Sequence, residues 1–476
     1  MHRFRIILLL LMLSTTLAHA RQLNYYADLE NTEDFSEAHL VSAIDSLTPG
    51  GGGLFVWVAN DLRPALWGIR FKSSQSGKAG SWVRQFNGPV MADWFGARHM
   101  PQSLAGTIPS FRNLGYDDLT IQRRFTQYIP DISLDDTPDR TALQMCMIAL
   151  ENGYYSVSLG HGDYYINKTV RLPEKIKPGD FTSYTIDGNG ATVYPVNGNG
   201  FAFFESLPAD QRQGLDLFTA RRFTIFNLIL RGKALPGKGA VGIRIGATFH
   251  SKFENIHFSD LDTGIVLRHA MSSEIYRCNA VNCYAISYYL GSGEGVWPGA
   301  NAPNSGSNQS RVIGSRVFVA EGQSAGVYIS NSSECRVIDL ALDGGQERTI
   351  DYAVVINTGG TTTVKDGYVT GLHGEAGVGK ALIKCRGDGN AVFEIRDLFV
   401  QMKCTLVELE VISGYAQMNC SNFSYFPPGS PFANKGNGGA WSFTNVFEKN
   451  AEVKWKTGAG YSQPVPERIR NIRKLM

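Results

Sequence analysis

A short apolar strand returns at intervals of about two to three dozen residues between residues 242 and 412. Gly, Asn, Ser and Asp stand at the joins, where the backbone needs positive φ or side-chain hydrogen bonds. A repeat of this length indicates units that bury their apolar faces only by stacking on one another. Because the runs are short and lack a 3.6-residue period, the sequence predicts an all-β parallel solenoid with one coil per repeat. The recurring strands are 242–245, 264–267, 285–288, 326–329, 353–356, 381–383 and 406–409.

Residues 1–20 have the pattern of a cleavable secretory signal peptide. Arg3 and Arg5 form a basic start, residues 6–13 are apolar, and Ala20 ends a small-residue cleavage site. We therefore expect a cut after Ala20 and a secreted or periplasmic protein. The apolar run is too short to span a bilayer, and no later run is long enough, so no membrane span is expected.

Charge and cysteine content exclude two function classes. The chain has 45 Lys and Arg residues against 43 Asp and Glu, and removal of the signal segment takes away two of the arginines. The mature chain is then neutral, which gives no support for a nucleic-acid partner. Its seven cysteines form no Cys-x-x-Cys pair and no His cluster at zinc spacing, so no metal site is predicted. Buried thiols are the favoured interpretation, and a Cys278–Cys283 disulfide is the alternative.

Outside the repeats we expect three further segments. Residues 21–92 form a small N-terminal module, with a helix over residues 34–47 and a strand over residues 54–58, that shields the first coil from edge-to-edge pairing. The β-helix itself is expected over residues 93–430, and residues 431–476 form a closing segment at the C-terminal end.

An amphipathic helix is predicted at the start of the solenoid. Pro138 suits a first helical position, and Thr137 before it suits an N-cap. Ala142, Met145 and Ala149 follow at helical spacing, which extends the helix to about residue 150.

The early motifs resemble a known superfamily. They are Trp82 to Phe86, Trp94-Phe95-Gly96-Ala97, Asp135-Asp136-Thr137, Gly162 to Ile166, and Ile186-Asp187-Gly188-Asn189-Gly190. This series resembles the opening of the pectate-lyase-like superfamily, which includes phage tailspikes and related exported bacterial proteins. The resemblance covers roughly residues 50–450. It implies a right-handed single-stranded parallel β-helix whose N-terminal end is plugged by a helix, and its tailspike members raise the expectation of a homotrimer. It leaves the chemistry open, because the superfamily hosts lyases, hydrolases, epimerases and inert binding proteins.

Acidic residues recur at one corner of the predicted solenoid. Aligning the strands 317–319 and 340–342 places Glu321 and Asp343 at the same corner of successive coils. The next repeat places His373 and Glu375 in the corresponding region. An earlier one places Asp260 and Asp262 there. Since neighbouring coils lie about 4.8 Å apart, these side chains form an acidic column.

This column suits two reactions. Carboxylates about 5 Å apart suit a retaining glycosidase, and a separation of about 6.5–9.5 Å suits an inverting one. A lyase instead needs a base beside an arginine or a calcium ion, and Arg316, Arg336 and Arg348 are close enough in sequence to supply the charge. The alternative interpretation is that these acids satisfy turn backbone groups or face water.

One repeat is longer than the others. Its excess, residues 291–310, is rich in Gly, Asn, Ser and Pro and contains Glu294 and Trp297. Such an insertion often builds a binding wall on a solenoid, and Trp297 would stack on a sugar ring. The alternative is a loop whose tryptophan packs back on the coil.

Two function hypotheses follow. The first is an exported enzyme that acts on polysaccharide, a glycoside hydrolase or a polysaccharide lyase, with calcium as a cofactor only for the lyase. Its catalytic residues are expected to be Glu321, Asp343, His373 and Glu375, and its substrate-binding residues Asp260, Asp262, Glu294, Trp297, Arg316 and Arg336. The second is a non-catalytic glycan-binding or structural surface protein of tailspike-like ancestry, favoured by the lack of a complete catalytic signature.

Overall fold

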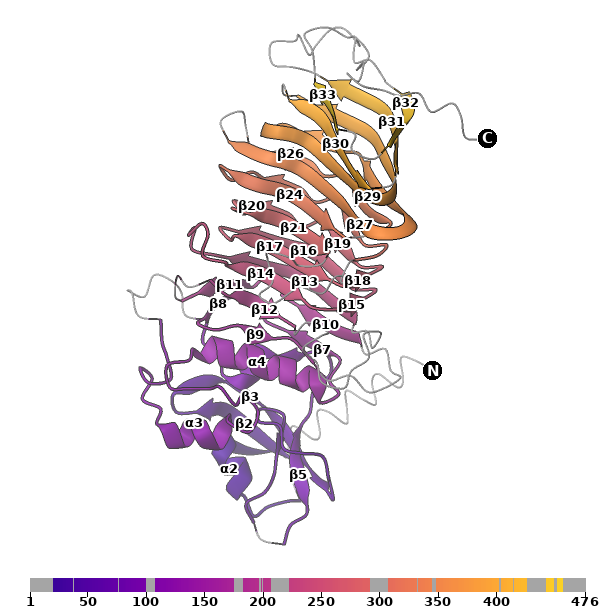
Figure 1. Cartoon of the computed structure of the whole chain (residues 1–476). Coiled ribbons are helices and arrows are strands. Elements are labelled where there is room, and N and C mark those ends of the chain that lie inside the picture. The colour runs from indigo at the N-terminus through magenta and orange to yellow at the C-terminus, as the bar shows by residue number, and fades with distance from the viewer. Residues whose placement is uncertain are drawn as a thin grey trace, which may run out of the picture. The chain divides into compact units, whose positions relative to one another are not determined.

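The computed structural model divides the chain into two compact units, residues 1–168 and residues 169–476 (Figure 1). It describes residues 20–36, 38–75, 77–99, 108–174, 183–196, 198, 200–206, 222–291, 307–331, 333–344, 348–401, 404–413, 415–425, 442–448 and 452–456. Within these ranges no helix is long and apolar enough to cross a membrane.

The first unit is built on a five-stranded sheet with the strand order β1-β2-β3-β5-β4. β1 runs parallel to β2, and the other neighbours are antiparallel. Its core packs Tyr26, Phe55, Phe71 and Trp82 between the sheet and the first helix. The elements of this unit are β1 (Arg21–Tyr25), α2 (Tyr26–Asn31), β2 (His39–Asp45), β3 (Thr48–Ala59), β4 (Arg70–Phe71), β5 (Gly80–Arg84), β6 (Val90–Met91), η1 (Ala92–Phe95), α3 (Asp118–Arg124), α4 (Pro138–Glu151), β7 (Ser156–Ser158) and β8 (Asp163–Ile166).

The helix predicted over residues 34–47 is wrong, because the strand β2 occupies half of this stretch. Burial alternates at its start, with His39 and Val41 buried and Leu40 exposed, which is the two-residue period of a half-buried strand. The glycine run that follows belongs to β3, the partner of β2. A side chain at Gly53 would place its Cβ 2.1 Å from Nη1 of Arg84, so the guanidinium would have to move from its place in the core.

The helix predicted from Pro138 is confirmed as α4. The hydroxyl of Thr137 accepts a hydrogen bond from the backbone N–H of Arg140 at 3.2 Å, as an N-cap should, and Pro138 takes the first turn. The helix is buried along almost its whole length and packs against η1, β7 and β8. Its depth explains why polar residues at its start must find partners inside the protein.

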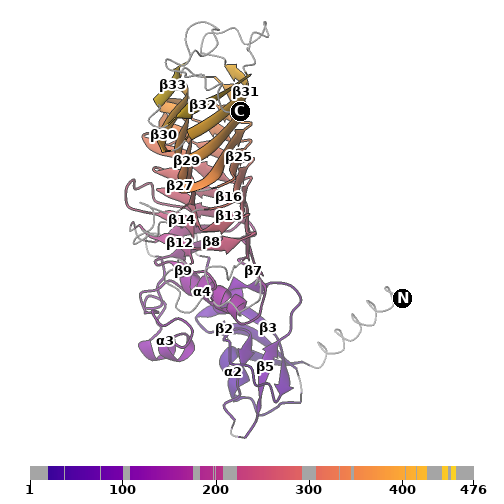
Figure 2. The same ribbon diagram turned by 45° about the vertical axis from the view of Figure 1, so that its right-hand side comes forward.

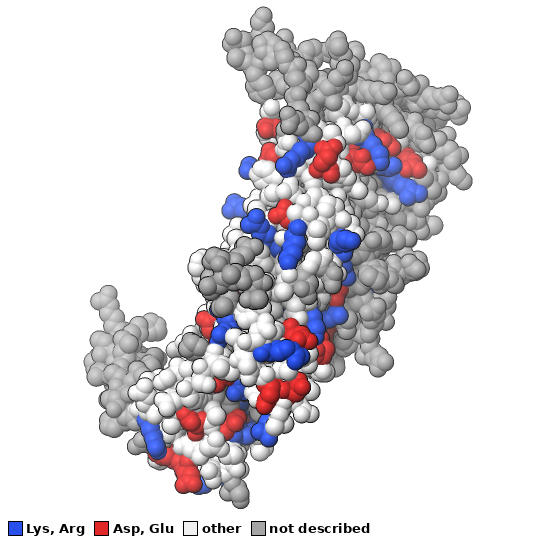
Figure 3. Space-filling model, turned by 90° about the vertical axis from the view of Figure 1, so that its left-hand side faces the viewer, with Lys and Arg blue, Asp and Glu red and all other residues white. Residues whose placement is uncertain are grey.

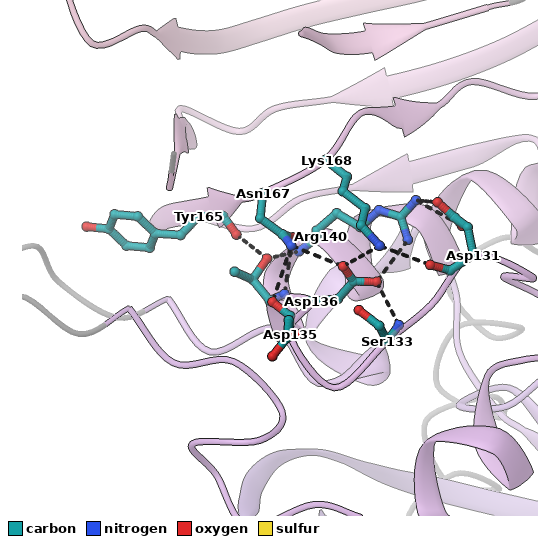
Figure 4. A network of polar contacts seen from close by, with 9 residues as sticks. Asp131, Ser133, Asp135, Asp136, Arg140, Tyr165, Asn167 and Lys168 are labelled. Carbon is teal, nitrogen blue, oxygen red and sulfur yellow. Dashed lines mark hydrogen bonds and ion pairs between the residues drawn. The ribbon is translucent and has the colours of Figure 1, made fainter. Parts of the chain in front are cut away.

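Those partners form a network around Asp136, just before α4 (Figure 4). The Asp136 carboxylate is fully buried and lies 2.8 Å from Nζ of Lys168 and 3.8 Å from Nη1 of Arg140. It also accepts hydrogen bonds from the side chain of Asn167 and the backbone N–H of Ser133, each at 3.0 Å. The network ties the entry of the helix to the strand β8 and to the chain before the helix.

A histidine joins η1 to the same helix. Nε2 of His99 lies 2.7 Å from Oδ1 of Asp93, and its ring packs edge-on against Tyr164 at a centroid distance of 4.3 Å. Burial is the largest influence on the imidazole and acts to lower its pKa. The hydrogen bond to Asp93 and the charges of Asp139 and Asp93 outweigh burial, so the pKa of His99 is raised.

This raised pKa makes one contribution to stability depend on pH. A group whose pKa is higher in the folded state stabilises fully below its unfolded pKa, about 6.5 for histidine, and loses that contribution as pH rises through the folded pKa. We therefore expect His99→Gln to lower the free energy of unfolding more at about pH 6 than at about pH 9. Urea denaturation at the two pH values measures this difference, and an equal loss at both would contradict the assignment.

The second unit is a right-handed parallel β-helix, as the sequence predicts, and Figure 2 shows its coils stacked one on another. Antiparallel pairs occur only at its C-terminal end among the described strands, where β33 joins β30 and β32 joins β31. Its strands are β9 (Val170–Arg171), β10 (Ser183–Asp187), β11 (Thr192–Pro195), β12 (Ala202–Glu205), β13 (Arg222–Arg231), β14 (Val241–Ile245), β15 (Thr248–Phe249), β16 (Lys252–Ser259), β17 (Thr263–Arg268), β18 (Ala270–Met271), β19 (Glu274–Tyr276), β20 (Asn279–Val281), β21 (Ile286–Gly291), β22 (Arg311–Ile313), β23 (Arg316–Phe318), β24 (Gln323–Ser330), β25 (Cys335–Ile338), β26 (Ala341–Asp343), β27 (Thr349–Thr370), β28 (His373–Gly374), β29 (Gly377–Val400), β30 (Thr405–Ser413), β31 (Tyr415–Tyr425), β32 (Ser442–Glu448) and β33 (Glu452–Lys456).

The core of this unit is a set of side-chain columns that run from coil to coil. Each inward position registers with the equivalent position of the next coil, and its side chain is almost completely buried. One column contains Phe204, Ile243, Ile265, Tyr288, Val327, Val354, Ile383 and Val407. Such stacking removes apolar surface from water, at about 25 cal/mol per Å².

All seven cysteines are free and buried, which confirms the thiol interpretation over the Cys278–Cys283 disulfide. Burial raises the pKa of each of these two thiols to about 12. They therefore remain protonated and pack as small apolar side chains.

Candidate functional site

A cavity of about 820 Å³ opens on the outer face of the sheet that contains β12, β14 and β17. All of its lining residues belong to the second unit. We call it the corner pocket, because it lies where the chain turns a corner to enter several of the strands. It is lined by Thr169, Gly200, Phe201, Ala202, Glu205, Pro236, Gly237, Gly239, Val241, Arg244, Asp262, Thr263, Tyr284, Ala285 and Ser324.

Strand register determines which side chains reach the pocket. Ala202 of β12, Val241 of β14 and Thr263 of β17 are register partners at the start of their strands, and all three line the pocket. Three residues further on, Glu205 is the partner of Arg244. Because the neighbours of Arg244 in β14 are inward-facing isoleucines, its own side chain faces outward.

Glu205 and Arg244 form an ion pair in the pocket wall. Oε1 of Glu205 lies 2.9 Å from Nη1 of Arg244, and its other oxygen accepts a hydrogen bond from Arg171. Only 12% of the Arg244 side chain is exposed, and burial lowers its pKa, an effect that Glu205 partly offsets. A guanidinium remains charged in any protein environment, so the pocket contains a fixed cation beside a fixed carboxylate.

One wall of the pocket is the loop of residues 232–240, and Asp262 holds it in place. Oδ1 of Asp262 accepts the backbone N–H of Gly237 at 2.7 Å. Its Oδ2 accepts those of Gly239 and, at 3.2 Å, Ala240. The sequence predicts Asp262 as a substrate-binding residue. The structure places it in the lining, but with its oxygens bound to the loop backbone, so it positions the wall.

Two of the predicted corner acids, Asp260 and Glu321, do not line this pocket. Asp260 accepts a hydrogen bond from Asn282 at 3.2 Å. Glu321 accepts two from Thr349, at 3.0 Å from the backbone N–H and 3.1 Å from the hydroxyl. Both carboxylates therefore help to connect one coil to the next.

The other predicted catalytic residues lie together on the outer wall formed by β26 and β28. Leu342 is the register partner of Gly374, so Asp343 and Glu375 occupy equivalent positions in adjacent coils. Asp343 is paired with Arg316, whose Nε lies 3.1 Å from Oδ2.

Glu375 has two partners of its own on this wall. Its Oε1 lies 3.0 Å from Nε2 of His373 and 3.2 Å from the amide nitrogen of Gln401. We call Asp343, Glu375, His373 and Arg316 the outer-wall cluster. The structure thus brings these four predicted residues together, outside the lining of the corner pocket.

The other predicted substrate-binding residues, Arg336, Glu294 and Trp297, are not among the residues that the structure describes in the corner pocket or the outer-wall cluster. Arg336 of β25 packs its guanidinium over the ring of Tyr368 at 4.8 Å. Glu294 and Trp297 lie outside the described residues.

On the face drawn in Figure 3, acidic and basic side chains lie beside one another, and neither sign forms a continuous area. The described part of the chain contains no group of three or more His, Cys, Asp and Glu side chains that could hold a metal ion.

Sequence reasoning missed the lining residues Glu205, Arg244 and Tyr284 of the corner pocket, and Arg171, which pairs with Glu205. Arg244 carried a usable signal, because it is a charge between two isoleucines in a strand that was otherwise apolar. Glu205 carried no such signal, because the coils before residue 240 have irregular lengths, which hide the equivalent positions.

No model of a known protein family and no curated protein sequence matches this chain. Its fold is similar to solved structures. WceF of Pantoea stewartii, a glycan biofilm modifying enzyme with a bacteriophage tailspike-like parallel β-helix fold, matches with a TM-score of 0.51 and 12% identity over 89% of this chain and 53% of that one. The tailspike protein of Acinetobacter baumannii phage AM24 matches with a TM-score of 0.51 and 15% identity, over 86% of this chain and 65% of that one.

The tailspike protein of Acinetobacter phage vB_ApiP_P1 matches with a TM-score of 0.50 and 13% identity, over 85% of this chain and 64% of that one. The chain thus spans about half to two thirds of the length of these proteins. At identities this low, the structural similarity establishes a shared tailspike-like parallel β-helix fold and nothing more.

Proposed function

We propose that this tailspike-like β-helix binds a polysaccharide in the corner pocket and cleaves it, as a glycoside hydrolase or a polysaccharide lyase. The observation that carries the proposal is the pocket itself, a cavity of about 820 Å³ on the outer wall with the Glu205–Arg244 pair inside it. The similarity in fold to a glycan biofilm modifying enzyme supports it. A substrate of this kind lies outside the cytoplasm, so the proposal includes export through the predicted signal peptide.

The lining of the pocket has the chemistry that sugars need. Its volume falls within the range of about 300–1,000 Å³ that small-molecule sites occupy. The ring of Phe201 offers an apolar surface, and the hydroxyls of Thr263, Tyr284 and Ser324 can donate or accept hydrogen bonds. Because the wall is the outer face of a stack of coils, a polymer can continue past the pocket on either side.

Two places can supply the proton transfers. In the pocket, Glu205 can act as a base while Arg244 neutralises the carboxylate of an acidic sugar, which is the arrangement a lyase requires. On the outer wall, Asp343 and Glu375 come from adjacent coils, so their separation of about one coil suits a retaining hydrolase.

A second candidate function is glycan binding without cleavage, and a specific observation favours it. Every carboxylate discussed above already has partners, as with Asp262 on backbone N–H groups and Glu205 between two arginines. The oxygens of these carboxylates are already engaged as hydrogen-bond acceptors, so the carboxylates hold the shape of the surface that a glycan would contact.

Depolymerisation of a panel of acidic and neutral polysaccharides tests the proposal. Cleavage is measured by new reducing ends and by absorbance of unsaturated products, with EDTA and with added CaCl₂. Glu205→Gln and Asp343→Asn, one variant in each of the two places, are compared with Glu254→Gln, a matched control whose carboxylate pairs with Lys252 at 2.7 Å on β16. We expect cleavage in wild type and control, and unsaturated product would identify a lyase. Binding of a polysaccharide without any cleavage would replace the proposal with the second function, and neither binding nor cleavage would overturn both.

A further inference from the structure

The first unit contains a separate cavity of about 320 Å³ between α2, α3 and β4. We call it the module pocket. All of its lining residues belong to the first unit, so nothing about it depends on the corner pocket or on the proposed function.

The inner surface of the module pocket is aromatic. Tyr26 and Phe71 are buried in the core, while Trp67 and Tyr128 are half-buried and stand at its wall. The Trp67 ring is fixed by edge-on packing against Phe125, at a centroid distance of 5.0 Å, and against Tyr26, at 5.4 Å. A rigid aromatic wall of this kind gives a sugar ring a flat apolar surface to lie against.

The charged residues of the lining are mostly basic. Arg70, Lys72, Arg123 and Arg124 line the pocket, against a single acidic lining residue, Glu30. Carboxylates outside the lining hold two of these arginines. Oδ2 of Asp61 lies 3.2 Å from Nε of Arg70, and Oδ2 of Asp45 lies 2.5 Å from Nη1 of Arg124.

Donors remain available after these contacts. Nζ of Lys72 donates one hydrogen bond, to the carbonyl oxygen of Asp61 at 2.6 Å, and an ammonium has three donors. Arg123 is exposed and has no ion pair among the described residues. The pocket therefore presents positive charge beside a fixed aromatic wall.

We propose that the module pocket binds a single carboxylate-bearing sugar, a uronic acid unit. The sugar carboxylate pairs with Arg123 and Lys72, and its ring lies against Trp67. Its hydroxyls bond to the amide of Gln127 and the hydroxyl of Thr120, both in the lining. The volume is at the lower end of the range for small-molecule sites, which suits one sugar rather than a long oligosaccharide.

Glu30 gives the proposal a directional test. Desolvation by the surrounding wall raises its pKa, and the charge of Arg124 only partly offsets this. An ionised Glu30 repels a bound carboxylate, so Glu30→Gln should bind the acidic sugar more tightly. A purely structural role of this residue would not produce tighter binding.

Calorimetric titration of the full chain with glucuronic acid, glucose and sulfate tests the proposal. We expect glucuronic acid to bind, and glucose and sulfate to bind at least about tenfold more weakly, because each lacks one half of the recognition. The double variant Arg123→Ala/Lys72→Met should weaken glucuronic acid binding by about tenfold or more.

Lys380→Met is the matched control, since its amine pairs with Asp351 at 2.8 Å in the second unit, and it should bind as wild type does. Equal binding of glucose, binding of sulfate alone, or unchanged binding in the double variant would overturn the proposal. So would a loss of affinity in Glu30→Gln.

Discussion

Replacing Asp136 with alanine is expected to lower the free energy of unfolding by about 3–5 kcal/mol. The carboxylate is fully buried and serves Lys168, Arg140, Asn167 and the backbone of Ser133 at the entry of α4. Without it Arg140, which is only 2% exposed, keeps the carboxylate of Asp131, which is 63% exposed. The buried guanidinium of Arg140 then lacks a buried negative charge beside it, and an uncompensated buried charge is what makes breaking a buried pair destabilising.

The neighbouring residue provides the control. Asp135 is 74% exposed and pairs with Arg112, itself 60% exposed, so Asp135→Ala should change stability by less than about 1 kcal/mol. Urea denaturation followed by tryptophan fluorescence measures both variants, since four of the seven tryptophans belong to the first unit. Similar losses in the two variants would show that the network does not hold the helix entry.

The β-helix could be predicted from sequence because its core repeats. Positions such as Ile243, Ile265 and Val327 recur once per coil, and each must be apolar because it stacks on its equivalent above and below. The same logic failed in the first unit, which has no repeat. There the pattern from His39 to Asp45 fits a short strand or part of a helix, and only pairing with β3 decides between them.

The candidate site was predictable only where the coils are regular. Asp343 and Glu375 fall where the alignment of repeats places them, but Glu321 does not, because the register partner of Asp343 is Phe318, three residues before Glu321. Glu205 and Arg244 are 39 residues apart, whereas Arg244 and its next register partner, Val266, are 22 apart. Insertions between early strands hide such partners, because register is determined by hydrogen bonding between coils and not by spacing along the chain.

Replacing Glu205 with glutamine is expected to reduce cleavage of the polysaccharide by about 100-fold or more, in the range typical of losing a proton-transfer group. Glutamine keeps the shape of the side chain but removes the charge that separates Arg171 from Arg244. The two guanidiniums then face each other without compensation, so the geometry of the pocket wall changes together with its charge. If the protein only binds glycans, the same variant should weaken binding, because the wall that orients the sugar is altered.

Glu408→Gln is the matched control for this prediction. Glu408 occupies the same outward column of the β-helix and pairs with Lys384 at 3.4 Å, but it does not line the corner pocket. Thermal melting and circular dichroism establish that both variants remain folded, and cleavage and binding are then compared at equal concentration. If Glu205→Gln retains the activity of Glu408→Gln while Asp343→Asn and Glu375→Gln lose it, the reaction belongs to the outer-wall cluster. In that case Arg316 and His373 are the groups that hold the two reacting carboxylates, Asp343 and Glu375, in place.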